Sequence, residues 1–130
     1  LNHRDIISHS KKIMEEYDVR PQSPNLITSN FSGGNQQKII LSRELNENPK
    51  VLLVGQPTRG VDIGAIEFIH QRLIDMRDRG AAILLVSVEL DEVLSLSDRI
   101  VVMFDGKIVG EKDNKNVTDR ELGLLMAGVV

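Results

Sequence analysis

The residues best suited to chemistry lie in one short segment, residues 32–38, which reads Ser-Gly-Gly-Asn-Gln-Gln-Lys. Two glycines at the start of a helix let backbone N–H groups approach an anion closely, a serine hydroxyl adds a donor, and the helix dipole favours negative charge. By itself the pattern also describes an ordinary flexible helix start, because short motifs match by chance. The phosphate-binding interpretation involves five residues: Ser32, Gly33, Gly34, Asn35 and Gln36.

Other kinds of reactive site find little support in the sequence. The chain has no cysteine, so disulfides, thiolate metal sites and cysteine nucleophiles are excluded. His3, His9 and His70 lack a matching pattern of carboxylates, and we expect ordinary histidines rather than a metal site. No segment fits the P-loop pattern G-x-x-x-x-G-K-[ST], since Gly106-Lys107 is followed by Ile108.

Two helices are expected around the Ser-Gly-Gly segment. Residues 2–17 carry apolar side chains at near-helical spacing, with Asn2 as the cap. Prolines and small polar residues after residue 20 predict a loop. The second helix opens at Ser32 and continues to about Leu45, before Asn48 and Pro49.

A strand, helix and strand follow in the chain. Residues 51–54 and 82–86 are short apolar runs, which favour strands buried on both faces. The helix between them begins at Ile63, and Asp62 is placed to cap it. This order predicts a right-handed parallel βαβ unit.

The last third of the chain shows three local signals. Ser87 is placed to cap a short helix, and Asp105-Gly106 is a hairpin turn between two apolar runs. Thr118 and Glu121 form a T-x-x-E capping box for a terminal helix. The expected class is therefore α/β.

Composition excludes several classes of protein. The chain has 130 residues, 41% of them hydrophobic, and its longest wholly apolar run, Ala81 to Val86, is far too short for a membrane span. Its net charge is −3, and it contains one tyrosine, three phenylalanines and no tryptophan. A negative net charge does not neutralise phosphates, and so few aromatic rings offer little surface on which bases could stack. Nucleic-acid binding is therefore disfavoured.

The order of the segments resembles the C-terminal part of an ABC-transporter ATPase domain. The resemblance covers nearly all of the chain after Phe31, in five segments: residues 32–37, the strand at 51–54, residues 56–62, residues 86–92 and residues 97–100. It identifies Ser32, Gly33 and Gly34 as the signature motif, which in that family binds the γ-phosphate of ATP held by the P-loop of an opposing domain. It identifies Asp62 as the D-loop aspartate. Asp62 can also be interpreted as a plain helix cap, and the two roles are compatible.

The chain departs from the family pattern where an active site keeps its catalytic groups. The Walker B strand of an active domain ends in Asp-Glu, whereas this chain has Gly55 and Gln56. Glycine cannot organise Mg²⁺, and a neutral amide cannot take a proton from water. The family's switch histidine falls at Val88. The resemblance therefore implies a catalytically degenerate site.

Residues 34–38 and 57–62 resemble, within that family, the second ATPase domain of double-domain sugar and nucleoside importers. Gln56 and the ending at residues 121–128 favour the nucleoside branch. The implied fold is a partial P-loop NTPase core with parallel strands. Residues 1–45 would be the end of the helical subdomain with the signature loop, and residues 46–130 the C-terminal part of the core. Because the chain begins with Leu1 and lacks a P-loop motif, we expect the P-loop portion to lie upstream.

The same resemblance implies ATP and Mg²⁺ as ligands of the full-length protein. It implies the first ATPase domain of the same chain and membrane permease subunits as partners, and the cytoplasmic face of the membrane as the location. A shortened core would expose strand edges, so we also expect self-association. Two alternatives remain: a non-catalytic α/β interaction or regulatory module, and a fully active ABC ATPase, which Gly55 and Gln56 contradict.

Overall fold

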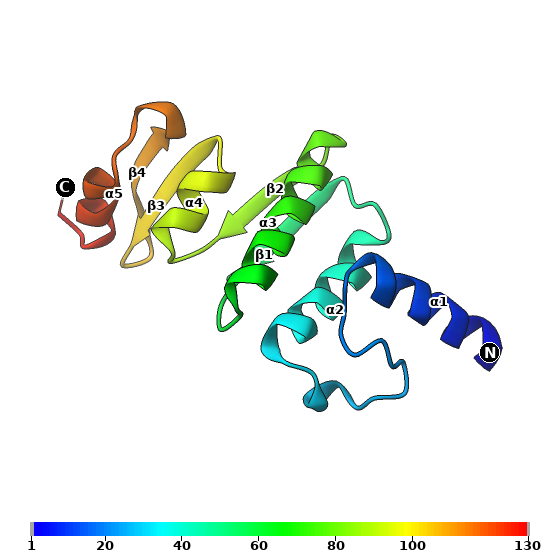
Figure 1. Cartoon of the computed structure of the whole chain (residues 1–130). Helices are drawn as coiled ribbons and strands as arrows, with labels where there is room; N and C mark the ends of the chain where they lie inside the picture. The colour runs from blue at the N-terminus through cyan, green and yellow to red at the C-terminus, as the bar shows by residue number, and fades with distance from the viewer. Residues whose placement is uncertain (1, 130) are drawn as a thin grey trace. The chain divides into compact units, whose positions relative to one another are not determined.

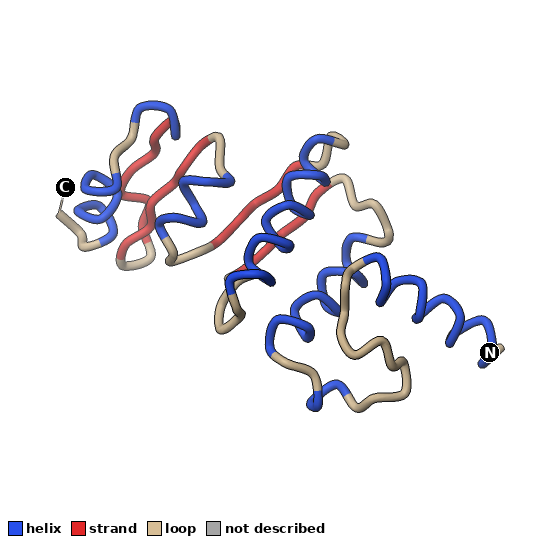
Figure 2. The backbone as a smooth tube through the Cα atoms, in the orientation of Figure 1, coloured by secondary structure: helices blue, strands red, loops and turns tan. Residues whose placement is uncertain are grey.

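The computed structural model describes residues 2–129, which form two compact units that divide between Leu84 and Leu85. The first unit contains α1 (His3–Glu16), a 3₁₀ turn η1 (Thr28–Asn30), α2 (Gly33–Leu45), β1 (Val51–Gly55), α3 (Ile63–Asp78) and the start of β2 (Ala82–Val86). The second contains α4 (Leu90–Leu96), β3 (Arg99–Phe104), β4 (Lys107–Asp113), a 3₁₀ turn η2 (Asn114–Asn116) and α5 (Asp119–Met126). The expected α/β class is confirmed (Figures 1 and 2).

Local capping signals define the helices of the first unit. The Asn2 side chain accepts a hydrogen bond from the Arg4 N–H (3.2 Å), so α1 begins where predicted. Ser32 and Asp62 cap α2 and α3 in the same way. Each cap satisfies a backbone donor that has no intrahelical acceptor.

The predicted parallel βαβ unit is present. β1 and β2 are neighbours in a two-stranded sheet, with α3 as the crossover between them (Figure 2). Ile69, Leu73 and Met76 form the buried stripe of α3, and each is no more than 4% exposed. They anchor α3 in the buried core.

The prediction that both strands are buried on both faces is wrong for this structure. Leu52 is buried, but Val51 and Leu53 are 65% and 74% exposed, and on β2 Leu84 and Val86 are 60% and 58% exposed. Alternate residues of a strand point to opposite faces, so only one face of the β1–β2 sheet is covered. Continuous apolar runs do not show how many layers cover a sheet.

The second unit is built on an antiparallel hairpin. β3 pairs with β4 from Arg99 opposite Asp113 to Phe104 opposite Lys107. Asp105 and Gly106 have φ angles of 47° and 73°, the left-handed values that an Asp-Gly hairpin turn requires. The predicted turn is therefore confirmed.

Two helices pack on this hairpin. Ile100, Val102 and Leu122 form its buried core, with partly buried side chains of α4 and α5 around it. The capping box of α5 is confirmed: the Thr118 N–H donates to Glu121 Oε2 (2.9 Å), and the Glu121 N–H donates to Thr118 Oγ1 (3.3 Å).

The predicted cap of α4 is wrong. Glu89, not Ser87, occupies the N-cap position, and its side chain makes no capping hydrogen bond. The Ser87 hydroxyl instead accepts from the Glu89 N–H (3.1 Å), in the turn before the helix. Serine side chains favour such short turns as readily as helix caps, which explains the error.

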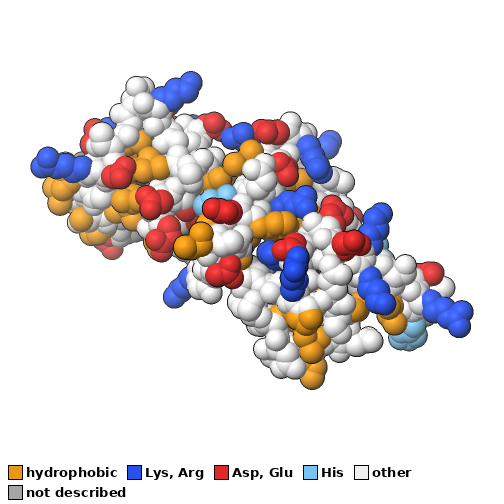
Figure 3. All heavy atoms as spheres, in the orientation of Figure 1, with side chains coloured by type: hydrophobic (Ala, Val, Ile, Leu, Met, Phe, Trp, Pro, Cys, Tyr) orange, Lys and Arg blue, Asp and Glu red, His pale blue; other side chains and the backbone are white. Residues whose placement is uncertain are grey.

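The surface carries charges of both signs. Acidic and basic side chains are interspersed on the face drawn in Figure 3. Among residues 2–129, no helix combines the length and the apolar character needed to cross a membrane. The same residues contain no group of three or more His, Cys, Asp or Glu side chains placed to hold a metal ion.

Candidate functional site

The Ser-Gly-Gly segment forms the first turn of α2. Ser32 is the N-cap, and its Oγ accepts hydrogen bonds from the Asn35 backbone N–H (3.4 Å) and from Asn35 Nδ2 (2.9 Å). Gly33 and Gly34 are the first two helical residues, whose N–H groups have no acceptor within a helix. This helix start has the donor arrangement that suits a phosphate oxygen.

The side chains of Asn35 and Gln36 hold the segment together. Asn35 Oδ1 accepts from the Arg20 N–H (2.8 Å), which joins the loop after α1 to the start of α2. Gln36 Nε2 donates to the Phe31 carbonyl (2.9 Å). Their hydrogen bonds shape the segment from within the chain, and their predicted contact with a cofactor stays a prediction.

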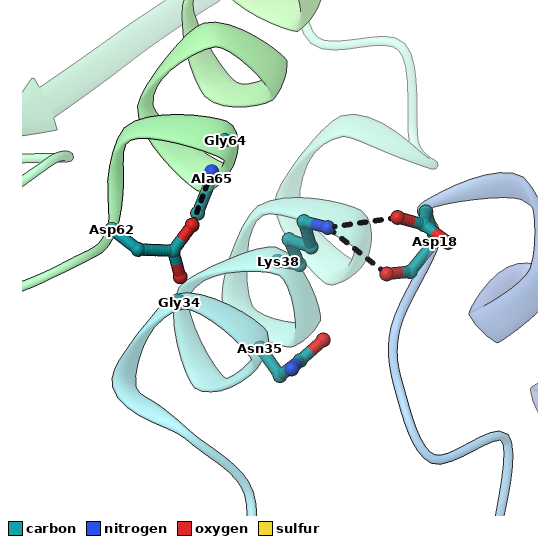
Figure 4. A pocket seen from close by; sticks show the side chains of 7 residues that line it. All are labelled: Asp18, Gly34, Asn35, Lys38, Asp62, Gly64 and Ala65. Carbon is teal, nitrogen blue, oxygen red and sulfur yellow. Dashed lines mark hydrogen bonds and ion pairs between the residues drawn. The ribbon is translucent and has the colours of Figure 1, made fainter.

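Asp62 begins α3 directly beside this turn. Its Oδ1 accepts from the Ala65 N–H (2.9 Å), so the predicted capping role is confirmed (Figure 4). A small hollow of about 230 Å³ lies between the start of α2, the start of α3 and the loop that follows α1. Its lining residues are Asp18, Gly34, Asn35, Lys38, Asp62, Gly64 and Ala65.

An ion pair that the sequence analysis missed borders the hollow. Lys38 is buried, and its Nζ donates to the Asp18 backbone carbonyl (3.0 Å) and to Asp18 Oδ2 (3.2 Å), as Figure 4 shows. The hydrogen bond from Arg20, and then that from Lys38, lowers the pKa of the Asp18 carboxyl. Asp18 and Lys38 are twenty residues apart, so no local spacing in the sequence indicated this pair.

Aromatic and basic side chains extend this contact to α3. Lys38 Nζ lies 4.8 Å from the centre of the Phe68 ring, and the Arg72 guanidinium lies 4.8 Å from the Tyr17 ring and 5.1 Å from Phe68. Arg72 also donates to the Glu16 carbonyl (2.6 Å). These cation–π contacts connect α2, α3 and the end of α1.

Tyr17 provides a test of this packing. Burial raises the pKa of its phenol above the ordinary value of 10.0, although the Arg72 guanidinium opposes the shift. The stability from the neutral phenol is therefore complete below about pH 10, and it is lost as the pH rises through the folded-state pKa. Tyr17 is the only tyrosine and there is no tryptophan, so phenolate absorbance reports it alone. We expect a higher titration midpoint in the native chain than in urea; equal midpoints would contradict the packing.

The positions expected to be degenerate lie at the ends of strands. Gly55 ends β1, and the next residue, Gln56, is half-buried with a φ of 50°. Val88 follows β2 and is 63% exposed. Gly55 has no side chain, and neither Gln56 nor Val88 can act as a carboxylate ligand or a general base.

Sequence comparison finds relatives that align with nearly the whole chain. The nucleoside import ATP-binding protein NupA of Lactococcus lactis is 52% identical over 128 residues, which are 98% of this chain and 25% of that protein. The guanosine import ATP-binding protein NupO of Bacillus subtilis is 48% identical, with the same coverage. The ribose import ATP-binding protein RbsA of Bacillus licheniformis is 39% identical over 89% of this chain and 24% of that protein. No family model matches the chain.

Solved structures agree with this likeness. An ATP-binding cassette of an ABC transporter matches with a TM-score of 0.74 and 26% identity, over 95% of this chain and 50% of that one. A dimeric cassette in a post-hydrolysis state, at 22% identity and a TM-score of 0.75, shares the fold over 90% of this chain and 50% of its own. The chain spans about a quarter of the length of the curated relatives that it matches. Over nearly its whole length the chain is therefore similar to ABC-importer ATP-binding proteins.

Proposed function

We propose that this chain is part of the ATP-binding subunit of an importer for nucleosides, with simple sugars as the second solute class. The observation that carries the proposal is the alignment of 98% of the chain, at 52% identity, with a nucleoside import ATP-binding protein. Guanosine and ribose importers follow among the relatives. The partners are the first ATPase domain of the same protein and membrane permease subunits, and the location is the cytoplasmic face of the membrane.

The chain would contribute its signature motif to the ATP site of the first ATPase domain. The start of α2 supports this role, because the N–H groups of Gly33 and Gly34 begin a helix that Ser32 caps. A γ-phosphate oxygen fits such a start, since helix N-termini favour negative charge. ATP held there by the first ATPase domain would supply a phosphoryl group for transfer to water, and Ser32, Gly33 and Gly34 of this chain would orient that group without taking or giving a proton.

The domain's own catalytic set would be inactive. Mg²⁺ in phosphoryl-transfer sites is held through one or two carboxylates, and Gly55 has no side chain to supply one at the end of β1. Gln56 can orient water but cannot remove its proton, and Val88 can do neither. Transport energy would then come from the other composite site, with Asp62 as the connection between the two.

The test is transport by the full-length protein reconstituted with its permease in proteoliposomes. We expect ATP-dependent uptake of labelled guanosine or adenosine that exceeds uptake of ribose. Faster ribose uptake would move the solute to the sugar class. Absence of ATP-driven uptake of either class would favour the alternative, a non-catalytic α/β interaction or regulatory module.

A further inference from the structure

The packing of the chain itself explains why residue 34, the second glycine of the signature segment, has no side chain. Gly34 is buried, and a Cβ placed on it would lie 2.8 Å from Ala65 Cβ and 3.1 Å from Asp62 Oδ2. Carbon atoms do not approach to 2.8 Å without a shift of one of them. Even alanine at residue 34 would therefore push the first turn of α2 away from the first turn of α3.

The turn that faces Gly34 cannot easily yield. Asp62 Oδ1 is held by the Ala65 N–H (2.9 Å), which fixes the carboxylate beside Gly34. Ile69, one turn further along α3, is 1% exposed in the core. Gly33 approaches the same segment, since a Cβ on it would lie 3.1 Å from the Gly60 carbonyl oxygen. Both signature glycines therefore lie against the chain that starts α3.

We infer that Asp62 and Ala65 are positioning residues that determine where the Gly34 N–H lies, because the start of α3 is the surface on which the first turn of α2 packs. The inference rests on the proposed function for its effect on ATP turnover, but not for the packing itself. Gly34 would be required because Ala65 occupies the space that a side chain needs, in addition to any close approach by a phosphate.

A reciprocal exchange tests the packing in the 130-residue chain, without ATP. Gly34→Ala should lower the melting temperature by several degrees. Ala65→Gly removes the opposing methyl group and leaves only the 3.1 Å approach to Asp62 Oδ2, so adding Gly34→Ala to Ala65→Gly should cause a much smaller further loss than in the wild-type background. Gly64→Ala is the matched control on the same turn, since its Cβ would lie an ordinary 3.4 Å from Asp62 Oδ1. Equal losses from Gly34→Ala in both backgrounds would overturn the inference.

The same variants test positioning in the full-length transporter, at a temperature where all of them are folded. Gly34→Ala should lower ATP turnover about tenfold in the wild-type background and less than about twofold in the Ala65→Gly background. Asp62→Asn, which keeps the capping oxygen, should lose less turnover than Asp62→Ala, which removes it. Two results would contradict the inference that these residues position the Gly34 N–H: an equal loss of turnover from Gly34→Ala in both backgrounds, or an equal loss from Asp62→Asn and Asp62→Ala. A wild-type transporter without ATP turnover would refute the proposed function, while the melting experiment would still decide the packing.

Discussion

A transporter with Gly33→Asp is expected to lose at least about 100-fold in ATP-driven uptake, whereas Gly33→Asn retains a much larger share. The two side chains have nearly the same shape, and both meet the Gly60 carbonyl 3.1 Å from the Cβ position, so their steric effects match. They differ in charge. A carboxylate at the start of α2 repels a γ-phosphate that the motif is proposed to bind, and an amide does not.

The expected effect of the charge on stability is opposite to its expected effect on activity, so this pair of variants separates loss of phosphate binding from loss of folding. A negative charge in the first turn of a helix stabilises the helix, so the Asp variant should melt no lower than the Asn variant. Uptake and ATP turnover of the reconstituted full-length protein, with melting curves of both variants, give the comparison. Equal activities for Asp and Asn would show that no phosphate binds at this turn.

Gln56→Ala provides the internal reference for the same assay. Because Gln56 cannot act as a base, its removal should change ATP turnover by less than about threefold. A loss from Gln56→Ala as large as that from Gly33→Asp would show that this domain's own site is catalytic. The proposal of one working site and one degenerate site would then be wrong.

The 130-residue chain alone is expected to bind Mg-ATP with a dissociation constant weaker than about 1 mM. It presents one side of the proposed composite site, and a single side recovers little of the cost of ordering the ligand. The buried lysine near the motif does not compensate, since Lys38 Nζ already contacts the Asp18 carbonyl and carboxylate. The Asp18 and Asp62 carboxylates beside the hollow also disfavour an added anion.

Titration calorimetry with Mg-ATP measures this directly, and the Gly33→Asp chain serves as the matched control. We expect the two titrations to be indistinguishable up to millimolar ATP. Micromolar affinity in the wild-type chain that Gly33→Asp removes would mean that the signature segment binds nucleotide without a partner domain.

Short-range signals in the sequence were sufficient for much of the scaffold. The caps at Asn2, Ser32, Asp62 and Thr118 join residues no more than three apart, and the Asp105-Gly106 turn depends only on its own φ angles. Such features form in the same way wherever the segment lies. The βαβ order followed from apolar periodicity alone, and the likeness to ABC ATPases came from motif order.

Tertiary structure decided the features that depend on distant residues. The exposed face of the β1–β2 sheet depends on what covers it, which apolar runs in the strands cannot report. Lys38 contacts Asp18, twenty residues earlier, and Gly34 meets Ala65, more than thirty residues later. The sequence by itself determined that a glycine pair begins a helix suited to phosphate. Only the packing of α2 on α3 showed that Gly34 must also lack a side chain to fit its own chain, because steric exclusion acts through space between segments that the sequence separates.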